Sequence, residues 1–380
     1  MARAVLTVIA VIQTILAIQF ARRVWRTIRG KRISAEPAAA RTGSVSVIVP
    51  VLNEVHRVGQ CLESLLEQGA PVEEILVVDG GSTDGTDLLV SRYAERDQRV
   101  RLVRTGPIPD GWNGKAFGLQ AGLDHSFSEA KWILTVDADV QVRSCGINRT
   151  VAFAESERVP VLSVATTQIA NSPGLSAVHP SLLSTLVYRF GVPGHVARTL
   201  DDVQANGQFA LYDRIALLRV NGFEVARDSI CEDITIARHL FLSGYQVGFY
   251  EGDDVAVTEM YPDAVSCLQT WPRSLALRDR FMPNAGATGL LSLAFLQVMP
   301  LITTLLLPRS IQPGYFTMVN RILFGVRLGI AFGTRRAYER PFRTYWLSPL
   351  FDPVTLVFYV SNLLRRTHVW RGRQLVSRES

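Results

Sequence analysis

Between residues 44 and 140, short runs of apolar and β-branched residues alternate with stretches in which apolar residues recur at helical spacing. The short runs predict strands, and the stretches between them predict helices. The predicted strands are 45–49, 74–79, 100–104 and 131–136, and the predicted helices are 55–67, 84–94 and 114–125. This alternation is typical of βαβ units. It predicts an α/β fold with a mostly parallel sheet flanked by helices.

Beyond residue 140 the pattern is less regular. Strands are predicted at 161–168, 206–212 and 245–250, and a helical pattern begins at 232. Residues 171–200 contain three prolines and several glycines, which disfavour regular structure. We expect this segment to be mobile or to face a membrane, with one apolar helix near 181–190.

Longer apolar stretches lie at both ends of the chain. Residues 4–20 are free of charge and are followed by six basic residues, which predicts an uncleaved membrane anchor with its basic end in the cytosol. An amphipathic surface helix is the weaker reading, because Gln13 and Gln19 form no polar face. Residues 287–307 and 317–333 predict a hairpin of membrane helices. Residues 345–364 are broken by two prolines and an aspartate, so we expect them to be re-entrant or interfacial; two simple spans are the alternative.

These patterns predict five regions. They are an N-terminal transmembrane anchor at 1–22, a basic linker at 23–43, the α/β domain at 44–260, an interfacial segment at 261–286 and a C-terminal membrane region at 287–380. Aromatic and basic residues are mixed at 269–281, as in helices that lie at the headgroup level. The arrangement predicts a multi-pass protein of the cell (inner) membrane whose α/β domain is cytoplasmic.

Composition supports the membrane assignment. Of the 380 residues 48% are hydrophobic, and the net charge of +6 comes from 40 Lys and Arg against 34 Asp and Glu. Much of the arginine excess lies at 22–32 and 309–378, beside the apolar stretches, which favours anionic lipid headgroups over nucleic acid as its partner. The four cysteines lack disulfide or zinc spacing and fit a reducing compartment.

Acidic and polar clusters follow each of the first four predicted strands. They lie at 50–54, 79–86, 107–115 and 137–139. Because the carboxyl ends of parallel strands meet at one edge of a sheet, we expect all four clusters to line one crevice. Asp137 and Asp139 would repel each other there unless a hard divalent cation, itself bridging a diphosphate, lies beside them. A turn that caps the next helix is the alternative reading of this pair. No glycine-rich dinucleotide or P-loop motif is present.

Three of these stretches resemble the signatures of family 2 glycosyltransferases with the GT-A fold. They are VIVPVLNE at 47–54, VVDGGSTDGT at 77–86 and VDAD at 136–139. GWNGK at 111–115 resembles a narrower signature of a bacterial, membrane-associated subgroup that includes carotenoid- and hopanoid-associated glycosyltransferases. The resemblance covers about residues 44–260.

The resemblance implies a set of residues that bind a UDP-sugar and a metal ion. The first signature contributes Pro50, Asn53 and Glu54, and the second contributes Asp79 and Asp84, with Glu54 and Asp79 on the uracil and ribose. Lys115 matches a basic position near the diphosphate. Asp137 would lie near the ribose or sugar and beside the metal, Asp139 would bind Mg²⁺ or Mn²⁺, and Gln208 would lie beside the donor sugar.

An acidic pair opens the predicted helix at 232. Glu232 and Asp233 could simply complement the positive end of the helix dipole. Inverting sugar transfer, however, needs a base that removes the proton of the attacking hydroxyl. The pair resembles the base motif of the family, which implies that Asp233 is the base and that Glu232 orients it.

The resulting hypothesis is a metal-dependent inverting glycosyltransferase. It would move one sugar from a UDP-sugar to a hydroxyl, or a carboxyl, of a lipid-like acceptor such as a carotenoid, hopanoid or glycolipid precursor. The alternatives are a polyprenyl-phosphate glycosyltransferase, a processive polysaccharide synthase and an inactive scaffold that binds nucleotide sugar. The synthase is disfavoured because Gln269 and Trp271 do not complete a QxxRW motif, with Arg273 out of place.

Overall fold

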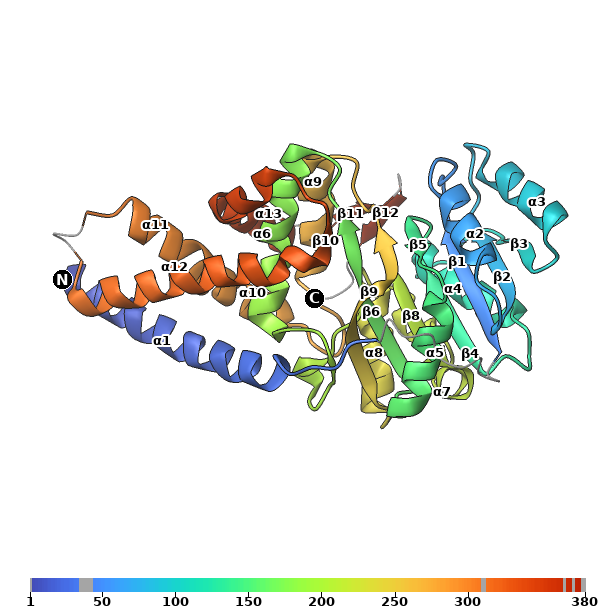
Figure 1. Cartoon of the computed structure of the whole chain (residues 1–380), viewed down its shortest axis with the longest axis horizontal. Helices are drawn as coiled ribbons and strands as arrows, with labels where there is room; N and C mark the ends of the chain where they lie inside the picture. The colour runs from blue at the N-terminus through green and yellow to red at the C-terminus, as the bar shows by residue number, and fades with distance from the viewer. Residues whose placement is uncertain (1, 34–43, 309–311, 365–366, 371–372, 377–380) are drawn as a thin grey trace.

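The α/β region is built around one large twisted sheet (Figure 1). The computed structural model describes residues 2–33, 44–308, 312–364, 367–370 and 373–376. Within these residues ten strands form the sheet, and eight of them follow the order β3-β2-β1-β4-β8-β6-β9-β5. Their bounds are β1 Val45–Val51, β2 Val72–Asp79, β3 Val100–Arg104, β4 Trp132–Val136, β5 Val140–Val142, β6 Val161–Ile169, β8 Phe209–Asp213 and β9 Val247–Thr258.

The first half of the sheet is parallel and the second half is mixed. Strand β1 pairs in parallel with both β2 and β4, and β2 pairs in parallel with β3. Strand β8 then runs antiparallel between β4 and β6, whereas β6 and β9 are parallel. Strands β1 and β4 consist mainly of buried aliphatic residues, as strands covered on both faces do. The predicted α/β fold with a mostly parallel sheet is confirmed.

Helices cover both faces of the sheet. On one face pack α2 (Val58–Leu66), α3 (Thr86–Arg96) and α5 (Gly146–Glu157); on the other pack α4 (Gly114–His125), α7 (Arg214–Arg219) and α8 (Glu232–Leu242). Alternate residues of β1 point to opposite faces of the sheet. Val47 and Val49 pack in the core beneath α2, α3 and α5, and Ile48 packs in the core beneath α4, α7 and α8. The α/β region therefore has three layers.

The segment that follows β6 differs from the prediction. Residues Pro173–Phe190 form one helix, α6, whose side chains are mostly buried. The apolar helix predicted near 181–190 is present, but it begins earlier, at Pro173. Pro173 stands in the first turn, where no backbone donor is needed, and Ser172 caps the helix by accepting from the Leu175 amide at 3.3 Å. Tertiary packing around α6 overrides the local effect of Pro180 in its interior.

Four helical stretches are long and apolar enough to cross a membrane. They are Arg3–Thr27, Ala285–Leu305, Gly314–Ala337 and Arg343–Leu364 within the described part of the chain. The component helices are α1 (Ala2–Thr27), α10 (Ala285–Ser292), the π-helical η3 (Leu293–Val298), α11 (Met299–Leu305), α12 (Gly314–Thr334), η6 (Arg343–Phe351) and α13 (Asp352–Leu364). Membrane association is supported. The last stretch, expected to be broken, is continuous enough to span.

The helical region extends away from the sheet, with α1 and α12 side by side (Figure 1). It is joined to the sheet by the short strand β10 (Tyr338–Glu339), which pairs in parallel with β6. Helix α9 (Ala264–Leu275) includes Arg273 of the predicted interfacial segment and ends before Arg278 and Arg280. Its Trp271 ring stacks on His179 of α6 with centroids 4.3 Å apart.

Some shorter elements complete the described chain. They are β7 (His195–Val196), which pairs with β9, the 3-10 helices η1 (Leu200–Asp202), η2 (Glu224–Ala226) and η5 (Arg335–Ala337), and a hairpin of β11 (Thr367–Trp370) with β12 (Arg373–Val376). Residues 34–43 of the predicted basic linker lie outside the described residues.

Candidate active site

Loops from neighbouring strands meet at one edge of the sheet. Strands β1 and β4 are parallel and end there, and β8, which is antiparallel to β4, begins there. The Asp137 amide consequently donates to the Gln208 carbonyl at 3.1 Å. The edge predicted from strand polarity thus also receives residues from a strand of opposite direction.

The loops after β1 and β2 are fastened to each other. Asn53 Oδ1 accepts from the Thr83 backbone amide at 2.9 Å, and the backbone amide of Asn53 donates to Ser82 Oγ at 2.9 Å. Asp84 Oδ2 accepts from the Val55 amide at 3.1 Å. Asn53 has a left-handed backbone, with φ of 56°, which delays α2 to Val58 from the predicted start at 55.

Asp79 has a comparable role in its own loop. Its side chain is buried, and Oδ1 accepts from the Ser82 amide at 3.0 Å and from the Ser82 hydroxyl at 2.6 Å. Asn53, Asp79 and Asp84 are not among the residues that line the adjacent cavity, although Gly80 is. In this structure these three predicted donor-binding residues shape the loops.

A cavity of about 1450 Å³ opens at this edge of the sheet. The structure brings eight of the predicted site residues to its wall: Pro50, Glu54, Lys115, Asp137, Asp139, Gln208, Glu232 and Asp233. The walls of the same cavity continue onto α1, α6 and α12. Polar and apolar surfaces therefore share one enclosure.

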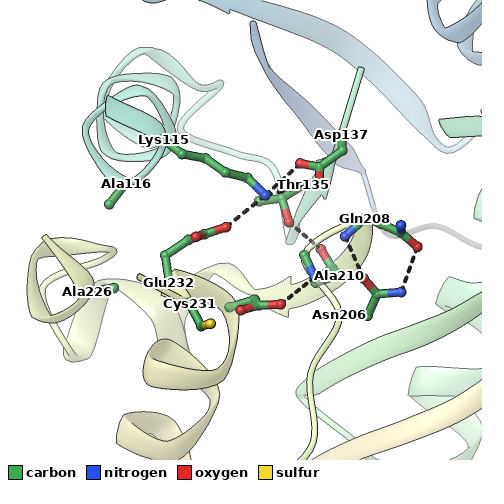
Figure 2. Close-up of polar contacts among 12 residues, drawn as sticks. Lys115, Ala116, Thr135, Asp137, Asn206, Gln208, Ala210, Ala226, Cys231 and Glu232 are labelled. Carbon is green, nitrogen blue, oxygen red and sulfur yellow. Dashed lines mark hydrogen bonds and ion pairs between the residues drawn. The ribbon is translucent and has the colours of Figure 1, made fainter. Parts of the chain in front are cut away.

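Lys115 connects the acidic groups of two distant segments (Figure 2). Its Nζ lies 2.8 Å from Asp137 Oδ1 and 2.8 Å from Glu232 Oε1. Burial alone would lower the pKa of Lys115, but the charges of Asp137, Glu232 and Asp233 raise it well above its ordinary value. The site thus holds a fixed positive charge.

Asn113 positions that lysine. Its side chain caps α4 by accepting from the Ala116 amide at 2.7 Å, and Nδ2 donates to the Ser229 carbonyl at 2.8 Å. Ser229 lies just before α8, so one side chain fixes the start of α4 against the start of α8. This brings Lys115 and Glu232 together, although the sequence separates them widely.

Asp233 is held by two backbone amides. Oδ2 accepts from the Gly207 amide at 2.8 Å and Oδ1 from the Ile234 amide at 2.8 Å. Burial, followed by the charge of Glu232, raises the pKa of Asp233 to about 6, against the opposing effect of Lys115. A carboxylate with a pKa near 6 is suited to act as a general base near neutral pH.

Gly207 is a site residue that the sequence reading missed. A Cβ at this position would lie 3.0 Å from Lys115 Nζ and 3.3 Å from Glu232 Oε1. The absence of a side chain therefore allows the lysine and the acidic pair to converge. No local pattern marks this glycine, because its neighbours come from other elements.

Asp139 faces Arg57, a second residue that the sequence reading missed. Arg57 Nη1 lies 3.6 Å from Asp139 Oδ2, and Arg57 Nη2 lies 2.8 Å from Glu54 Oε2. Asp139 Oδ1 is buried and accepts no hydrogen bond. Burial and the charge of Asp137 raise the pKa of Asp139 to about 7. In the sequence, the only indication of this contact is that a basic residue follows Glu54 by three positions.

These carboxylates fit a divalent cation. The unpartnered Oδ1 of Asp139 offers a hard oxygen ligand, and a cation there would offset the repulsion from Asp137. Among the described residues, no group of three or more His, Cys, Asp or Glu side chains could hold a metal alone. Mg²⁺ or Mn²⁺ would therefore need further oxygen ligands, which a diphosphate and water can supply.

Gln208 is held in place at the start of β8. Its Oε1 accepts from Asn206 Nδ2 at 2.9 Å, as Figure 2 shows, and from Thr166 Oγ1 at 2.5 Å. Thr166 and Asn206 also line the cavity and were not singled out from the sequence. The amide of Gln208 is thus oriented by residues of β6 and of the loop before β8.

Comparison with known proteins agrees with this geometry. Residues 46–216 match the family model of glycosyl transferase family 2. The 4,4'-diaponeurosporenoate glycosyltransferase of Staphylococcus aureus (strain MRSA252) is 26% identical over 248 residues, which are 61% of this chain and 61% of that protein. The chain thus matches less than two thirds of this relative's length.

A solved structure shares the fold. The mannosyltransferase PcManGT from Pyrobaculum calidifontis, in complex with GDP-Man and Mn²⁺, superimposes with a TM-score of 0.55 at 20% identity, covering 96% of this chain and 99% of that one. The sheet order and the superposition show a GT-A fold, and residues 46–216, a little under half of the chain, match glycosyl transferase family 2.

Proposed function

We propose that the protein transfers one sugar from a nucleotide sugar to a hydroxyl, or a carboxyl, of a lipid-like acceptor. The observation that carries this proposal is the shared cavity. Its wall includes the carboxylates of Asp137, Asp139 and Asp233 and also apolar residues of α1, α6 and α12. A water-soluble acceptor would leave the apolar part without a purpose.

Similarity to known proteins supports the two substrate classes. PcManGT was solved with the nucleotide sugar GDP-Man, and the relative from Staphylococcus aureus is named for 4,4'-diaponeurosporenoate. From the sequence signatures we propose a UDP-sugar as donor and a carotenoid, hopanoid or glycolipid precursor as acceptor.

In the proposed reaction the donor diphosphate lies near Lys115. The lysine is kept protonated by its carboxylate neighbours and provides positive charge for the leaving nucleotide. Asp137 and Asp139 would hold Mg²⁺ or Mn²⁺. When bound, the metal ion supplies charge stabilisation for the departing diphosphate. Arg57 orients Glu54 and contacts Asp139, so it links the loop after β1 to the acidic pair.

Asp233 acts on the acceptor. As the acceptor oxygen forms a bond to the anomeric carbon, the bond from that carbon to the diphosphate oxygen breaks. The acceptor proton passes to the Asp233 carboxylate, and the nucleoside diphosphate leaves with the electron pair. Attack opposite the leaving group inverts the anomeric configuration. Glu232, bound to Lys115 at 2.8 Å, keeps the lysine beside the base. A carboxyl acceptor is already ionised, so its transfer needs no base.

The basic residues near the membrane helices support an orientation. Arginines and lysines at 22–32 directly follow the apolar part of α1. By the positive-inside rule, we propose that this end of α1 and the α/β domain lie on the cytoplasmic side of the cell membrane.

The test is nucleotide release by the full-length protein in lipid nanodiscs with Mn²⁺. UDP- and GDP-sugars are supplied with and without a lipid extract of the host. We expect release that depends on the metal and is stimulated by lipid, with the sugar recovered in a lipid product. Release that is metal-dependent but indifferent to lipid, with sugar recovered only in soluble products, would contradict the lipid acceptor.

A further inference from the structure

The cavity is larger than a donor site requires. Its volume of about 1450 Å³ exceeds the roughly 300–1,000 Å³ of ordinary small-molecule sites. The part next to the carboxylates accommodates a nucleotide sugar, and the remainder extends between α1, α6 and α12. We call this remainder the helix groove; it is lined by residues such as Val24 of α1, Leu186 of α6 and Val326 of α12.

Helix α1 crosses this groove and is fastened on one side by a pair of amides. Gln13 Nε2 donates to Asn320 Oδ1 at 2.9 Å, and Asn320 Nδ2 donates back to Gln13 Oε1 at 3.1 Å. Gln13 Nε2 also donates to the Phe295 carbonyl at 2.9 Å. Both amide side chains are buried, so this contact fixes α1 on α12.

The other end of α1 is fastened to the α/β region. Thr27 Oγ1 accepts from the Val192 amide at 3.0 Å, and the Lys31 amide donates to the Gly194 carbonyl at 2.8 Å. Gly30 and Gly194 are in backbone contact, since a Cβ on Gly30 would lie 2.8 Å from the Gly194 Cα. Helix α1 is therefore tied down on both sides of the groove.

The stretch of α1 between these two attachments faces the groove with small or apolar residues, including Ala17, Ala21 and Val24. On α12, Gly329 and Gly333 line the groove, and a Cβ at either position would meet no atom within 4 Å. Together these residues form an apolar part of the cavity wall, and the carboxylates belong to the wall of the same cavity.

The same cavity contains a buried polar atom that has no protein partner. Thr167 is only 5% exposed, and its Oγ1 makes no hydrogen bond. Thr167 and Gln204, whose Nε2 is also buried without a partner, both line the cavity. A buried polar atom without a hydrogen bond destabilises the folded state unless a ligand forms that bond. The ligand therefore carries polar groups as well as an apolar portion.

We propose that the acceptor is a lipid with an elongated apolar chain, which lies in the helix groove under α1 and along Gly329 and Gly333 while its terminal polar group reaches Asp233. The inference rests on the proposed function and adds the binding path. Continuity of the groove with the carboxylate site argues for a single amphiphile, because two separate ligands would not need a connected passage.

The test fills the groove from α12. Gly329→Leu adds a side chain where the protein leaves open space, so it should obstruct the lipid without disturbing packing. Gly325→Leu is the matched control, because Gly325 lies on the same helix, has equally open space and does not line the cavity. Leucine favours the helix over glycine in both variants, so neither should lose stability.

Two measurements are made on each variant in nanodiscs. The first is sugar transfer to the host lipid extract. The KM for nucleotide sugar and the slow nucleotide release without added lipid extract are measured alongside it. The second is photolabelling by a diazirine-bearing C16 alcohol, with the labelled residues mapped. We expect Gly329→Leu to reduce lipid transfer at least about tenfold and to abolish labelling of Val326 and Leu186, with donor KM and lipid-free release unchanged. Gly325→Leu should resemble the wild type.

Equal labelling of the groove in Gly329→Leu and the wild type would overturn the binding path, as would equal losses in both glycine variants. If the wild type shows no lipid-stimulated transfer, the proposed function fails. The groove is then judged by labelling alone: labelling that Gly329→Leu blocks supports a lipid-chain site, and labelling spread over the outer surface contradicts it.

Discussion

Two regions of the described chain bury charge in opposite ways. At the edge of the sheet, Asp137, Asp139, Glu232 and Asp233 share Lys115 and Arg57 and line an open cavity. In the helical region, Arg327 of α12 and Asp352 of α13 form an ion pair with no exposed surface on either side chain. Neither of these two residues lines the cavity.

The carboxylate of the helical pair is fully satisfied. Asp352 Oδ2 accepts from Arg327 Nε at 2.7 Å, and Oδ1 accepts from Arg327 Nη2 at 3.0 Å. Ser181 Oγ and Gln297 Nε2 each donate to Oδ1 at 2.7 Å. The pair thereby joins α6, η3, α12 and α13, which is a structural role.

At the sheet edge, by contrast, the carboxylates outnumber their cations. Asp139 keeps an oxygen without a hydrogen bond, and the pKa values of Asp139 and Asp233 are raised to about 7 and about 6. A buried carboxylate whose two oxygens are both paired supports the fold, whereas buried carboxylates that outnumber their cations and face a cavity are available for a ligand. Four variants separate these two roles.

The largest effect is expected from Asp352→Leu. It leaves the Arg327 guanidinium buried without its carboxylate, which should cost about 3–5 kcal/mol in the free energy of unfolding. The measurement is denaturant-induced unfolding in detergent micelles. The double variant Arg327→Met/Asp352→Leu should recover most of the loss, because both charges are removed. A single variant as stable as the wild type would contradict the structural role of this pair.

Asp139→Asn should act on turnover and leave the fold intact. Loss of the metal-binding charge is expected to lower nucleotide release about 10³-fold, corresponding to several kcal/mol. The free energy of unfolding should be unchanged or slightly larger, because the substitution removes a buried charge whose raised pKa shows that its ionised form is disfavoured. Asp87→Asn, at a partly exposed ion pair with Arg104, is the control and should retain activity. Unimpaired turnover in Asp139→Asn would contradict the metal assignment.

Asp233→Asn removes the proposed base and should lower transfer to a hydroxyl acceptor about 10²- to 10³-fold. In the wild type the active form is the carboxylate, so the rate should fall about tenfold per pH unit below the pKa of about 6 and level off above it. Burial is the main cause of this raised pKa; among charged neighbours, Glu232 raises it further and Lys115 lowers it. The pH profile is recorded with saturating Mn²⁺.

The residual rate of Asp233→Asn should lack the acidic limb. If the variant still shows the fall in rate at low pH, that fall reports the titration of another group. An undiminished rate with a phosphorylated polyprenyl acceptor would favour the alternative in which the acceptor is already anionic and needs no base.

Gly207→Ala should have the smallest effect, about tenfold in turnover. The added Cβ would lie 3.0 Å from Lys115 Nζ, so the lysine must shift away from the acidic pair. Gly69→Ala is the matched control, because its Cβ would meet no atom within 4 Å. Steady-state kinetics should show the loss in kcat only for Gly207→Ala. Equal rates in the two variants would show that the close approach at Gly207 is not needed.

Much of the α/β region could be predicted from the chain pattern. Burial on both faces makes the strands continuous apolar runs, so β1, β2, β3 and β4 were recognisable within one or two residues. Their common direction then places the loops that follow them at one edge. The proposed metal-binding pair and the acidic loops follow from these local features and from the family signatures.

Local features were misleading where packing decided the outcome. The prolines of α6 suggested irregular structure, yet the helix is buried among α9, η6 and α13. Asp79, Asp84 and Asn53 match donor-binding positions, and in this structure their side chains hold the two loops together; donor binding by these residues stays a prediction. A motif names the residue type and its position in the chain, and it does not say which neighbour the side chain will bind.

The sequence by itself determined the sheet, the acidic edge and the apolar helices, because each depends on the spacing of residues close together in the chain. Only the tertiary structure decided that α8 meets α4 at Lys115 and that α1 and Asp233 line the same cavity. Those arrangements depend on contacts between distant segments: Asn113 with the loop before α8, the buried pair Arg238–Asp279 at 2.9 Å behind it, and Gly30 against Gly194. Such contacts leave no periodic signal in the chain, since each partner is placed by packing elsewhere in the fold.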